Sequence, residues 1–378
     1  ARRSRPRAEE EFAELSAFAR DELGIEELEA WDVAYAAEKL RQRKFDLSQE
    51  ELKPYFPVDQ VIEGLFGLVS RLFGVEIRER EGVDVWHPTV RFFDILEPDG
   101  SLRGSFYLDL YARPHKRGGA WMDECISRMR HADGRVQKPV AFLTCNSAPP
   151  AGDRPALFTH DEVITLFHEF GHGLQHMLTC IDWPEVSGIN GVEWDAVELP
   201  SQFMENWCWE REALDLFARH YETGEPMPQA LFDKLMASRH FHAALQMLRQ
   251  IEFGLFDMRI HNEPEAVHEK GIQGILDEVR EEVALIRPPA WNRFQNSFSH
   301  IFAGGYAAGY YSYKWAEVLS ADAFARFEEE GLFNPAVGAD FLHTVLELGG
   351  SRPAMEVFRA FRGREPSIDA LLRHNGLA

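Results

Sequence analysis

The sequence predicts a mainly α-helical protein with a small β-sheet, an α+β fold. Apolar residues recur at helical spacing through residues 8–45 and again from Thr159 almost to the end of the chain. Between these two regions lie three short segments rich in β-branched and aromatic residues, which are typical of strands. A helical pattern on both sides of a few strands indicates a sheet packed against helices.

The N-terminal region reads as helices. Residues 8–45 are rich in Ala, Glu, Leu and Arg, and they predict two or three helices with charged faces. The segment KPYFP at 53–57 ends this pattern, because each proline removes a backbone donor and restricts the residue before it. A further helix is predicted over 58–74, ended by Gly74. We therefore expect a helical segment over residues 1–82, followed by a second domain over residues 83–378.

Strands are expected in the middle of the chain. The segments VRFFDIL (90–96) and GSFYLDLYAR (104–113) predict two strands joined by a turn at EPDGS. A third strand is predicted at KPVAFLTCN (138–146). Gly and Pro residues then indicate a loop over 146–155.

Composition excludes several classes of protein. Lys and Arg total 40 and Asp and Glu total 62, so the formal charge is −22. This acidity argues against nucleic acid or an anionic membrane as the main partner. The four cysteines form no CxxC pair and no disulfide framework, which favours a reducing cytoplasm. No apolar run is long enough to cross a bilayer, so we expect no membrane association.

The motif HEFGH at 168–172 predicts a metal site on a helix. His168 and His172 are one turn apart, so both imidazoles can bind one ion. Glu169 projects beside them and can accept a proton from a metal-bound water. Thr159, followed by acidic residues, is a suitable N-cap for this helix.

The third ligand has to come from another segment. His176 lies eight residues after His168, about 12 Å further along the helix, so one ion cannot bind both. We interpret His176 as a packing or surface histidine. The next helical stretch (193–210) places four polar side chains on one face: Asp195, Glu198, Gln202 and Glu205. A carboxylate from this face would complete a set of two histidines and one glutamate, but spacing alone does not choose between Glu198 and Glu205.

Four segments together resemble the thimet oligopeptidase family of zinc metallopeptidases, and the resemblance covers essentially all 378 residues. The segments are FHEFGH (167–172), VELPSQFMENW (197–207), GSFYLDLYAR (104–113) and FSHIFAGGYAAGYYSY (298–313). The resemblance implies a zincin-type catalytic domain in residues 83–378. The alternative is a helical domain whose HExxH motif arose by chance, and the resemblance argues against it.

The resemblance also implies the metal ligands. The family's zinc-binding glutamate precedes a residue and then Pro-Ser-Gln, so ELPSQ assigns one Zn²⁺ per chain to His168, His172 and Glu198. Glu205 then becomes a structural carboxylate. Asp195, one turn before Glu198, is a candidate to orient a ligand imidazole.

The family further implies substrate-binding residues near the C-terminal end. Tyr306, Tyr310 and Tyr313 would share one face if their segment were helical, although such spacing more often marks a core stripe. A phenol can donate to a developing oxyanion without adding a charge. The resemblance makes Tyr313 and His300 catalytic. It assigns substrate binding to the remaining residues of this segment: Tyr306, Tyr310, Gly304 and Gly305.

The expected activity is hydrolysis of internal bonds in short peptides, with Glu169 as general base to a zinc-activated water. The strand at 140–146 is expected to pair with the extended substrate backbone. Two alternatives stay open: a dipeptidyl carboxypeptidase of the same family, and a zinc- and peptide-binding fragment without turnover.

Family members are much longer, and their helical N-terminal half forms the other wall of a deep channel. We therefore expect this chain to be a catalytic fragment, whose missing half completes the channel. Looser size selection or weak activity is expected of the fragment alone.

Overall fold

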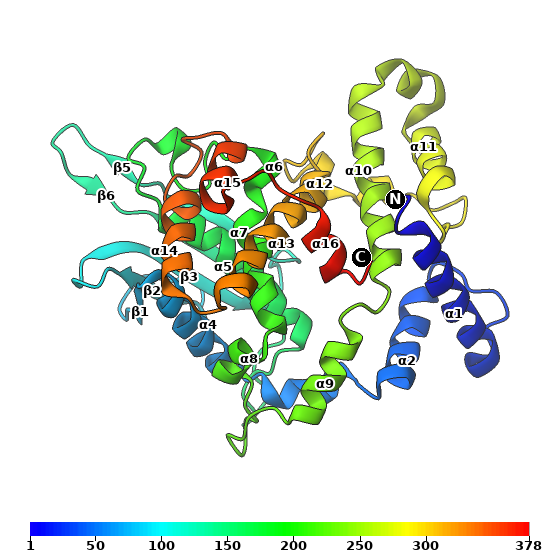
Figure 1. Ribbon diagram of the computed structural model, residues 1–378, viewed down its shortest axis with the longest axis horizontal. Coiled ribbons are helices and arrows are strands. Elements are labelled where there is room, and N and C mark those ends of the chain that lie inside the picture. Colours follow the sequence, from blue (N-terminus) through cyan, green and yellow to red (C-terminus); the bar gives the residue numbers. More distant parts are fainter. Residues whose placement is uncertain (378) are drawn as a thin grey trace. The chain divides into compact units, whose positions relative to one another are not determined.

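A computed structural model describes residues 1–377 (Figure 1). Contacts divide the chain into two compact units, each built from stretches that are separated in sequence. The first unit contains residues 1–48, residues 233–315 and the C-terminal residues from Asp369, whereas the second contains residues 49–232 and 316–368. A domain boundary near residue 82 stays a prediction. Within residues 1–377, no helix has both the length and the apolar character that crossing a bilayer requires.

The first unit is helical. Its long helices are α1 (Arg5–Leu23), α2 (Val33–Phe45), α10 (Ala243–Asn262) and α11 (Pro264–Val283). Shorter pieces are the end of α9 (Gln229–Ser238), α12 (Ser299–Phe302), the start of α13 (Ser312–Glu330) and α16 (Asp369–His374). Helix α1 packs on α2 through Leu15, Ala19, Ala36 and Leu40, and α10 packs along α11 (Figure 1).

The second unit contains a five-stranded sheet with the order β1-β2-β3-β7-β4. Its strands are β1 (Glu76–Glu79), β2 (Arg91–Leu96), β3 (Leu102–Tyr111), β4 (Trp121–Ile126) and β7 (Val140–Ser147). Strands β3 and β7 are parallel, and all other neighbours are antiparallel. A separate hairpin joins β5 (Met129–Arg130) to β6 (Val136–Gln137). The three predicted strands are confirmed as β2, β3 and β7.

The position of β7 corrects one expectation. Strand β7 lies between β3 and β4, so both of its edges are already paired. The prediction that residues 140–146 pair with substrate is therefore wrong, because a strand inside a sheet has no unpaired edge to offer. Strand β4, which the sequence did not predict, is the strand at that edge of the sheet.

Helices α4 (Val58–Phe73) and α5 (His160–Met177) pack on the sheet. Helix α4 ends at Gly74, whose φ of 72° lies in the left-handed region that glycine tolerates, as predicted. Helix α5 begins with a capping box between Thr159 and Glu162, which confirms the predicted N-cap. The other helices of this unit are α3 (Gln49–Leu52), α6 (Trp194–Val197), α7 (Leu199–Glu205), α8 (Arg211–Phe217), α14 (Pro335–Phe341), α15 (Ala354–Arg362) and most of α13.

Aromatic packing fixes α5 against the sheet. The ring of Phe170 on α5 lies edge-on to Phe106 of β3, with ring centroids 5.4 Å apart. Phe106 in turn stacks on Phe93 of β2 at 5.1 Å, and Phe66 of α4 completes the group. Such aromatic pairs add to the burial of apolar area. The histidine-bearing helix is thereby anchored on the fully buried core.

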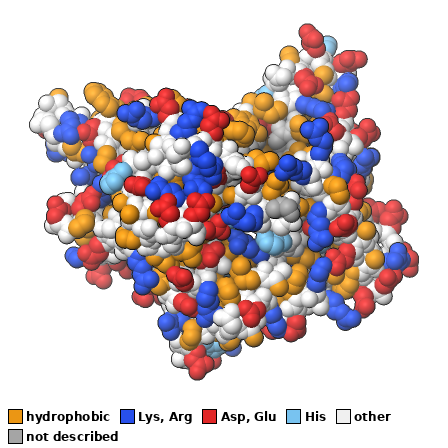
Figure 2. Space-filling model, in the orientation of Figure 1, with side chains coloured by type: hydrophobic (Ala, Val, Ile, Leu, Met, Phe, Trp, Pro, Cys, Tyr) orange, Lys and Arg blue, Asp and Glu red, His pale blue; other side chains and the backbone are white. Residues whose placement is uncertain are grey.

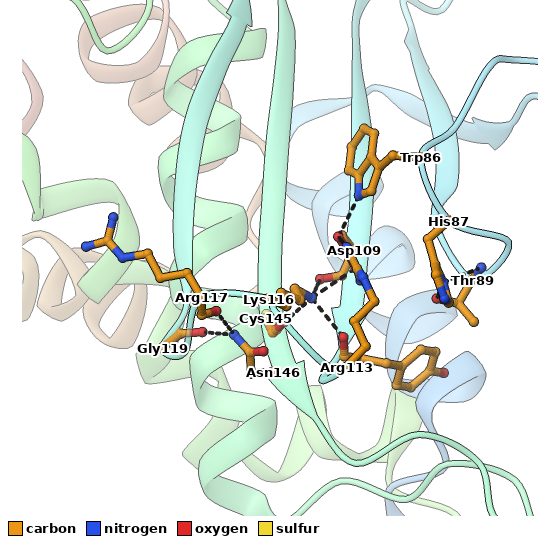
Figure 3. Close-up of polar contacts among 11 residues, drawn as sticks. Trp86, His87, Thr89, Asp109, Arg113, Lys116, Arg117, Gly119, Cys145 and Asn146 are labelled. Atoms are coloured by element: carbon orange, nitrogen blue, oxygen red, sulfur yellow. Dashed lines mark hydrogen bonds and ion pairs between the residues drawn. The ribbon is translucent and has the colours of Figure 1, made fainter.

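A buried charged cluster holds the loop between β3 and β4 (Figure 3). Asp109 near the end of β3 accepts hydrogen bonds from Arg113, Lys116 and Trp86 at 2.7–2.9 Å. The Lys116 ammonium also donates to the carbonyl oxygen of Cys145 on β7. Because the loop that leads to β4 is tied to β3 and β7, this cluster stabilises the edge of the sheet.

Candidate functional site

Helix α5 carries the three residues of the HExxH motif. The rings of His168 and His172 lie one turn apart, with centroids 5.0 Å apart and nearly perpendicular planes. His172 is buried and His168 is partly exposed. Glu169 lies next to them in sequence, and its side chain is also buried.

Glu198 joins the two histidines. It stands at the junction of α6 and α7 and is 1% exposed. Its Oε2 lies 3.3 Å from Nε2 of His168 and 3.1 Å from Nε2 of His172. The three ligand atoms all lie within 4.8 Å of one another. Among the described residues, this is the one group of at least three His, Cys, Asp or Glu side chains that could hold a metal ion.

Gly171 allows Glu198 to reach this position. A Cβ atom added there would lie 2.3 Å from the carbonyl oxygen of Pro200 and 2.6 Å from Cα of Ser201. No real side chain tolerates such distances. The glycine therefore lets the backbone of α7 rest directly on α5, which brings Glu198 to the histidines.

Glu205 has a role that the sequence did not assign to it. Nδ1 of His168 donates to Oε1 of Glu205 at 2.6 Å, which leaves Nε2 of His168 to face Glu198. A metal-binding histidine commonly has this kind of carboxylate partner on its other nitrogen. Glu205, to which the sequence analysis gave a structural role, therefore contacts a candidate metal ligand, and the role expected of Asp195 stays a prediction.

The electrostatics of the group fit a divalent cation. Burial by itself would raise the pKa of Glu198, but His172 and His168 hold that pKa well below its usual value. Burial would likewise lower the pKa of His168, but Glu198 and Glu205 raise it well above the usual value. Glu198 is therefore favoured in its ionised form, which is the form in which a carboxylate binds a metal ion. Two imidazole nitrogens and one carboxylate oxygen are the donor set of catalytic zinc sites.

Glu169 is placed to move a proton. Burial raises the pKa of its carboxyl group. Its Oε2 is buried and has no hydrogen-bond partner among the described residues. An unpartnered buried carboxylate oxygen beside a metal site can accept a proton from a bound water.

His176 has a packing role, in line with its interpretation from the sequence. Its side chain is fully buried, and Nε2 lies 3.0 Å from the carbonyl oxygen of Ile126 on β4. This hydrogen bond fastens the C-terminal part of α5 to the edge strand.

The predicted tyrosines gather in the first unit. The Tyr306 and Tyr313 rings stack with centroids 4.9 Å apart, and Tyr310 lies 5.0 Å from Tyr313. The His300 ring lies 5.9–6.3 Å from all three. The structure thus places the candidate metal ligands in the second unit, and the three tyrosines and His300 in the first.

The tyrosines meet for a reason other than the predicted one. Helix α13 starts only at Ser312, so a shared helical face does not align Tyr306 and Tyr310. Turns bring the rings together instead. They contain residues with positive φ, namely Gly305 at 87° and Ala308 at 54°.

Comparison with known proteins places the chain in a family. A profile described as Peptidase family M3 matches residues 1–377. The chain belongs to this peptidase family. It is 59% identical to oligopeptidase A of Salmonella typhimurium over 377 residues, all of this chain and 55% of the relative. The predicted family and the predicted class of enzyme, a metallopeptidase, agree with this result.

Other members of the M3 family differ in their named activities. The chain is 48% identical to a probable cytosolic oligopeptidase A of Arabidopsis thaliana, covering 98% of this chain and 54% of the relative. It is 37% identical to a dipeptidyl carboxypeptidase of Escherichia coli, with coverages of 99% and 55%. The chain thus spans about half the length of the curated relatives it matches.

Solved structures support the fold. A carboxypeptidase of Pyrococcus furiosus matches with a TM-score of 0.52 at 14% identity, covering 92% of this chain and 64% of that one. PZ peptidase A matches with a TM-score of 0.50 at 19% identity, with coverages of 71% and 42%. At these identities the likeness shows the fold alone, and it confirms the predicted class of mainly α with a small sheet.

Proposed function

We propose that this M3 family chain is the metal-binding part of a zinc oligopeptidase that hydrolyses internal bonds of short peptides. The observation that carries the proposal is the meeting of His168, His172 and Glu198 beside a buried, unpartnered oxygen of Glu169. The 59% identity to an oligopeptidase A supports the choice of substrate class. One Zn²⁺ per chain would be held by the two Nε2 atoms and the Glu198 carboxylate.

When bound, zinc supplies a Lewis acid that activates water and polarises the scissile carbonyl. The residues of the chain do the remaining work. Glu169 accepts the proton of the attacking water at its carboxylate and then donates it to the nitrogen of the leaving amine. Glu205 holds the tautomer and the orientation of His168 through Nδ1.

The tyrosine cluster is proposed to bind the reacting carbonyl and the peptide around it. Tyr313, with His300, would donate to the oxyanion that develops on the attacked carbonyl. Tyr306, the ring of Tyr310 and the turn at Gly304 and Gly305 would contact the substrate. The family resemblance supports these roles, and so does the clustering of the four rings.

Edge strand β4 is the proposed partner of the peptide backbone. One of its edges pairs with β7, and in the described part of the chain no strand pairs with the other. The hydrogen bond between His176 and Ile126 ties this strand to the helix that carries the metal ligands. Main-chain pairing of this kind tolerates varied side chains, which suits an enzyme that acts on many peptides.

The partners and location of the complete protein are part of the proposal. We propose that the additional half present in the relatives completes a substrate channel, and that the protein works in the cytoplasm. The name of the Arabidopsis thaliana relative supports this location. A formal charge of −22, with acidic and basic side chains interspersed on the face shown in Figure 2, does not favour nucleic acid as a partner.

Substituting Glu169→Gln tests the mechanism. The variant should keep about one zinc per chain, because the three ligands remain, while peptide turnover falls to background. Metal analysis and a cleavage assay are run on the same sample. Turnover at the wild-type rate would refute the role of Glu169.

A relative that is 37% identical is a dipeptidyl carboxypeptidase, so this activity is the alternative to test. Peptides blocked at both ends distinguish it from an oligopeptidase. Cleavage of the blocked peptide supports internal hydrolysis, whereas cleavage of only the free peptide supports the carboxypeptidase. Stoichiometric zinc without any turnover would support the other alternative, a zinc- and peptide-binding fragment that is not an active enzyme.

A further inference from the structure

A buried carboxylate outside the predicted site holds the segment between α12 and α13, residues 303–311, which we call the tyrosine loop. Asp257 lies on α10 and is fully buried. Its Oδ1 accepts the backbone N–H of Ala308 at 2.9 Å, and its Oδ2 accepts the backbone N–H of Tyr310 at 2.9 Å. Nδ1 of His261, one turn further along α10, lies 3.0 Å from Oδ1. Both oxygens of one carboxylate are therefore committed to the loop.

The loop adopts a backbone conformation that its sequence does not favour. Ala308 has a φ of 54°, in the left-handed region where a Cβ atom is unfavourable. Because Ala308 and Tyr310 are two residues apart, a single carboxylate that binds both amides fixes the intervening turn. A charged acceptor makes these hydrogen bonds stronger than bonds to a neutral oxygen.

The same helix also holds the other end of Tyr310. The Tyr310 hydroxyl donates to Oε1 of Gln250 at 3.1 Å. Gln250 and Asp257 are seven residues apart, which places them on one face of α10. The backbone and the hydroxyl of Tyr310 are thus both fixed to α10. Since the Tyr310 ring packs against His300 and Tyr313, its position limits where those two side chains can lie.

We propose that Asp257 is a positioning residue for the peptidase reaction: it clamps the turn at residues 308–310 and so presets Tyr313 and His300. The inference rests on the proposed function, because it assumes that these two side chains contact the substrate. The hydrogen bonds from Ala308 and Tyr310 to Asp257 can be tested by hydrogen exchange, which does not require an active enzyme. A preset donor costs no reorganisation when charge develops on the substrate.

The test substitutes Asp257→Asn in the complete, zinc-loaded protein. An amide side chain offers one acceptor oxygen where the carboxylate offers two, so one loop N–H loses its partner. Hydrogen exchange at Ala308 or Tyr310 should accelerate about tenfold. For a short peptide, kcat should fall by about tenfold or more, with little change in KM and no change in zinc content.

Glu252→Gln is the matched control. Glu252 is also a buried carboxylate on α10, but it bonds Arg249 and Arg280 and not the loop. Its substitution should lower the free energy of unfolding without changing exchange at Ala308 or Tyr310. Equal acceleration of loop exchange in both variants would reduce Asp257 to a general stabilising residue and overturn the proposal.

Hydrogen exchange tests the clamp by Asp257, and peptide cleavage tests the proposed function, so either claim can fail without the other. Unchanged loop exchange in Asp257→Asn overturns the clamp, whatever the activity. Faster exchange with unchanged kcat overturns the positioning role. If the zinc-loaded wild type cleaves no peptide, the proposed function fails, but the exchange comparison still decides whether the clamp exists.

A wild-type measurement covers the case in which the variant does not fold. Ala307 and Ala308 are both exposed, but only Ala308 has the Asp257 acceptor. The Ala308 amide should therefore exchange more slowly than the Ala307 amide. Equal rates would overturn the proposal.

Discussion

Oε1 of Glu205 lies 2.6 Å from Nδ1 of His168, and this contact turns Nε2 of His168 toward Glu198. Glu205 stands at the end of α7, whereas Glu198 stands just before its first residue. One short helix therefore supplies both the carboxylate that faces the two imidazoles and the carboxylate that orients one of them.

Replacing Glu205 with Gln should weaken zinc binding about 10- to 100-fold without abolishing it. The neutral amide loses the charge that favours the Nδ1-protonated tautomer, but all three ligands remain. Competition with a chelator of known affinity measures the change. The exposed Glu212→Gln on α8 is the control and should bind zinc as the wild type does. Wild-type affinity in the Glu205 variant would remove this residue from the site.

Gly171→Ala should disrupt the metal site by separating the two helices. The added Cβ would meet the backbone of Pro200 and Ser201, so α7 has to move away together with Glu198. We expect a loss of about 1–3 kcal/mol in the free energy of unfolding and a clear fall in zinc occupancy. Thermal unfolding and metal analysis check both results.

The control for this substitution is Gly67→Ala on α4. No atom lies within 4 Å of a Cβ added at Gly67, so the change should stabilise the protein slightly, by about 0.4–1 kcal/mol. Full zinc occupancy in Gly171→Ala would show that the close approach of α5 and α7 does not set the position of Glu198.

The sequence predicted best the elements with a strong local pattern. Helix α5 has a capping box and a long apolar stripe, and strands β2, β3 and β7 are buried and rich in aromatic or β-branched residues. Strand β4 was missed because its residues are only partly buried and include two acidic side chains. Local pattern also cannot show sheet order, so β7 was wrongly expected at an edge.

Site residues within one helix could also be predicted from the sequence, whereas those that depend on the packing of separate segments could not. The pair His168 and His172 follows from helical spacing, whereas spacing alone could not separate Glu198 from Glu205, and the family resemblance made that choice. The contact of Glu205 with His168 depends on how two helices cross, which a one-dimensional pattern does not record. Asp257 was missed for a related reason: it lies about fifty residues before the loop that it holds.

Asp109→Asn should destabilise the protein in a pH-dependent way. Burial alone would raise the pKa of Asp109, but hydrogen bonds from Arg113, Lys116 and Trp86 lower it from 3.8 to about 2. Removing the charge leaves Lys116, whose side chain is 5% exposed, without its buried counter-ion. At neutral pH we expect a loss of about 3 kcal/mol in the free energy of unfolding.

The sign of the pH dependence follows from the lowered pKa. The ionised Asp109 stabilises the fold fully above pH 4, and this contribution is lost as the pH falls from about 4 toward 2. The difference between wild type and variant should therefore be constant near neutrality and shrink in acid. Denaturant titrations at several pH values measure it, and the exposed Asp153→Asn serves as the control. A difference that persists unchanged at pH 2 would contradict the ion-pair explanation.

Tyr313→Phe should separate catalysis from binding. The phenyl ring can still stack on Tyr306, since that contact uses the ring face, but the proposed donor to the oxyanion is gone. We expect kcat to fall about 10²- to 10³-fold, with zinc content unchanged and KM nearly constant, because the lost bond forms only in the transition state. Steady-state kinetics on a short peptide measures this split. Tyr311→Phe on the neighbouring residue should keep kcat near the wild-type value, and a similar loss in both variants would point to damage to the loop and not to a missing hydroxyl.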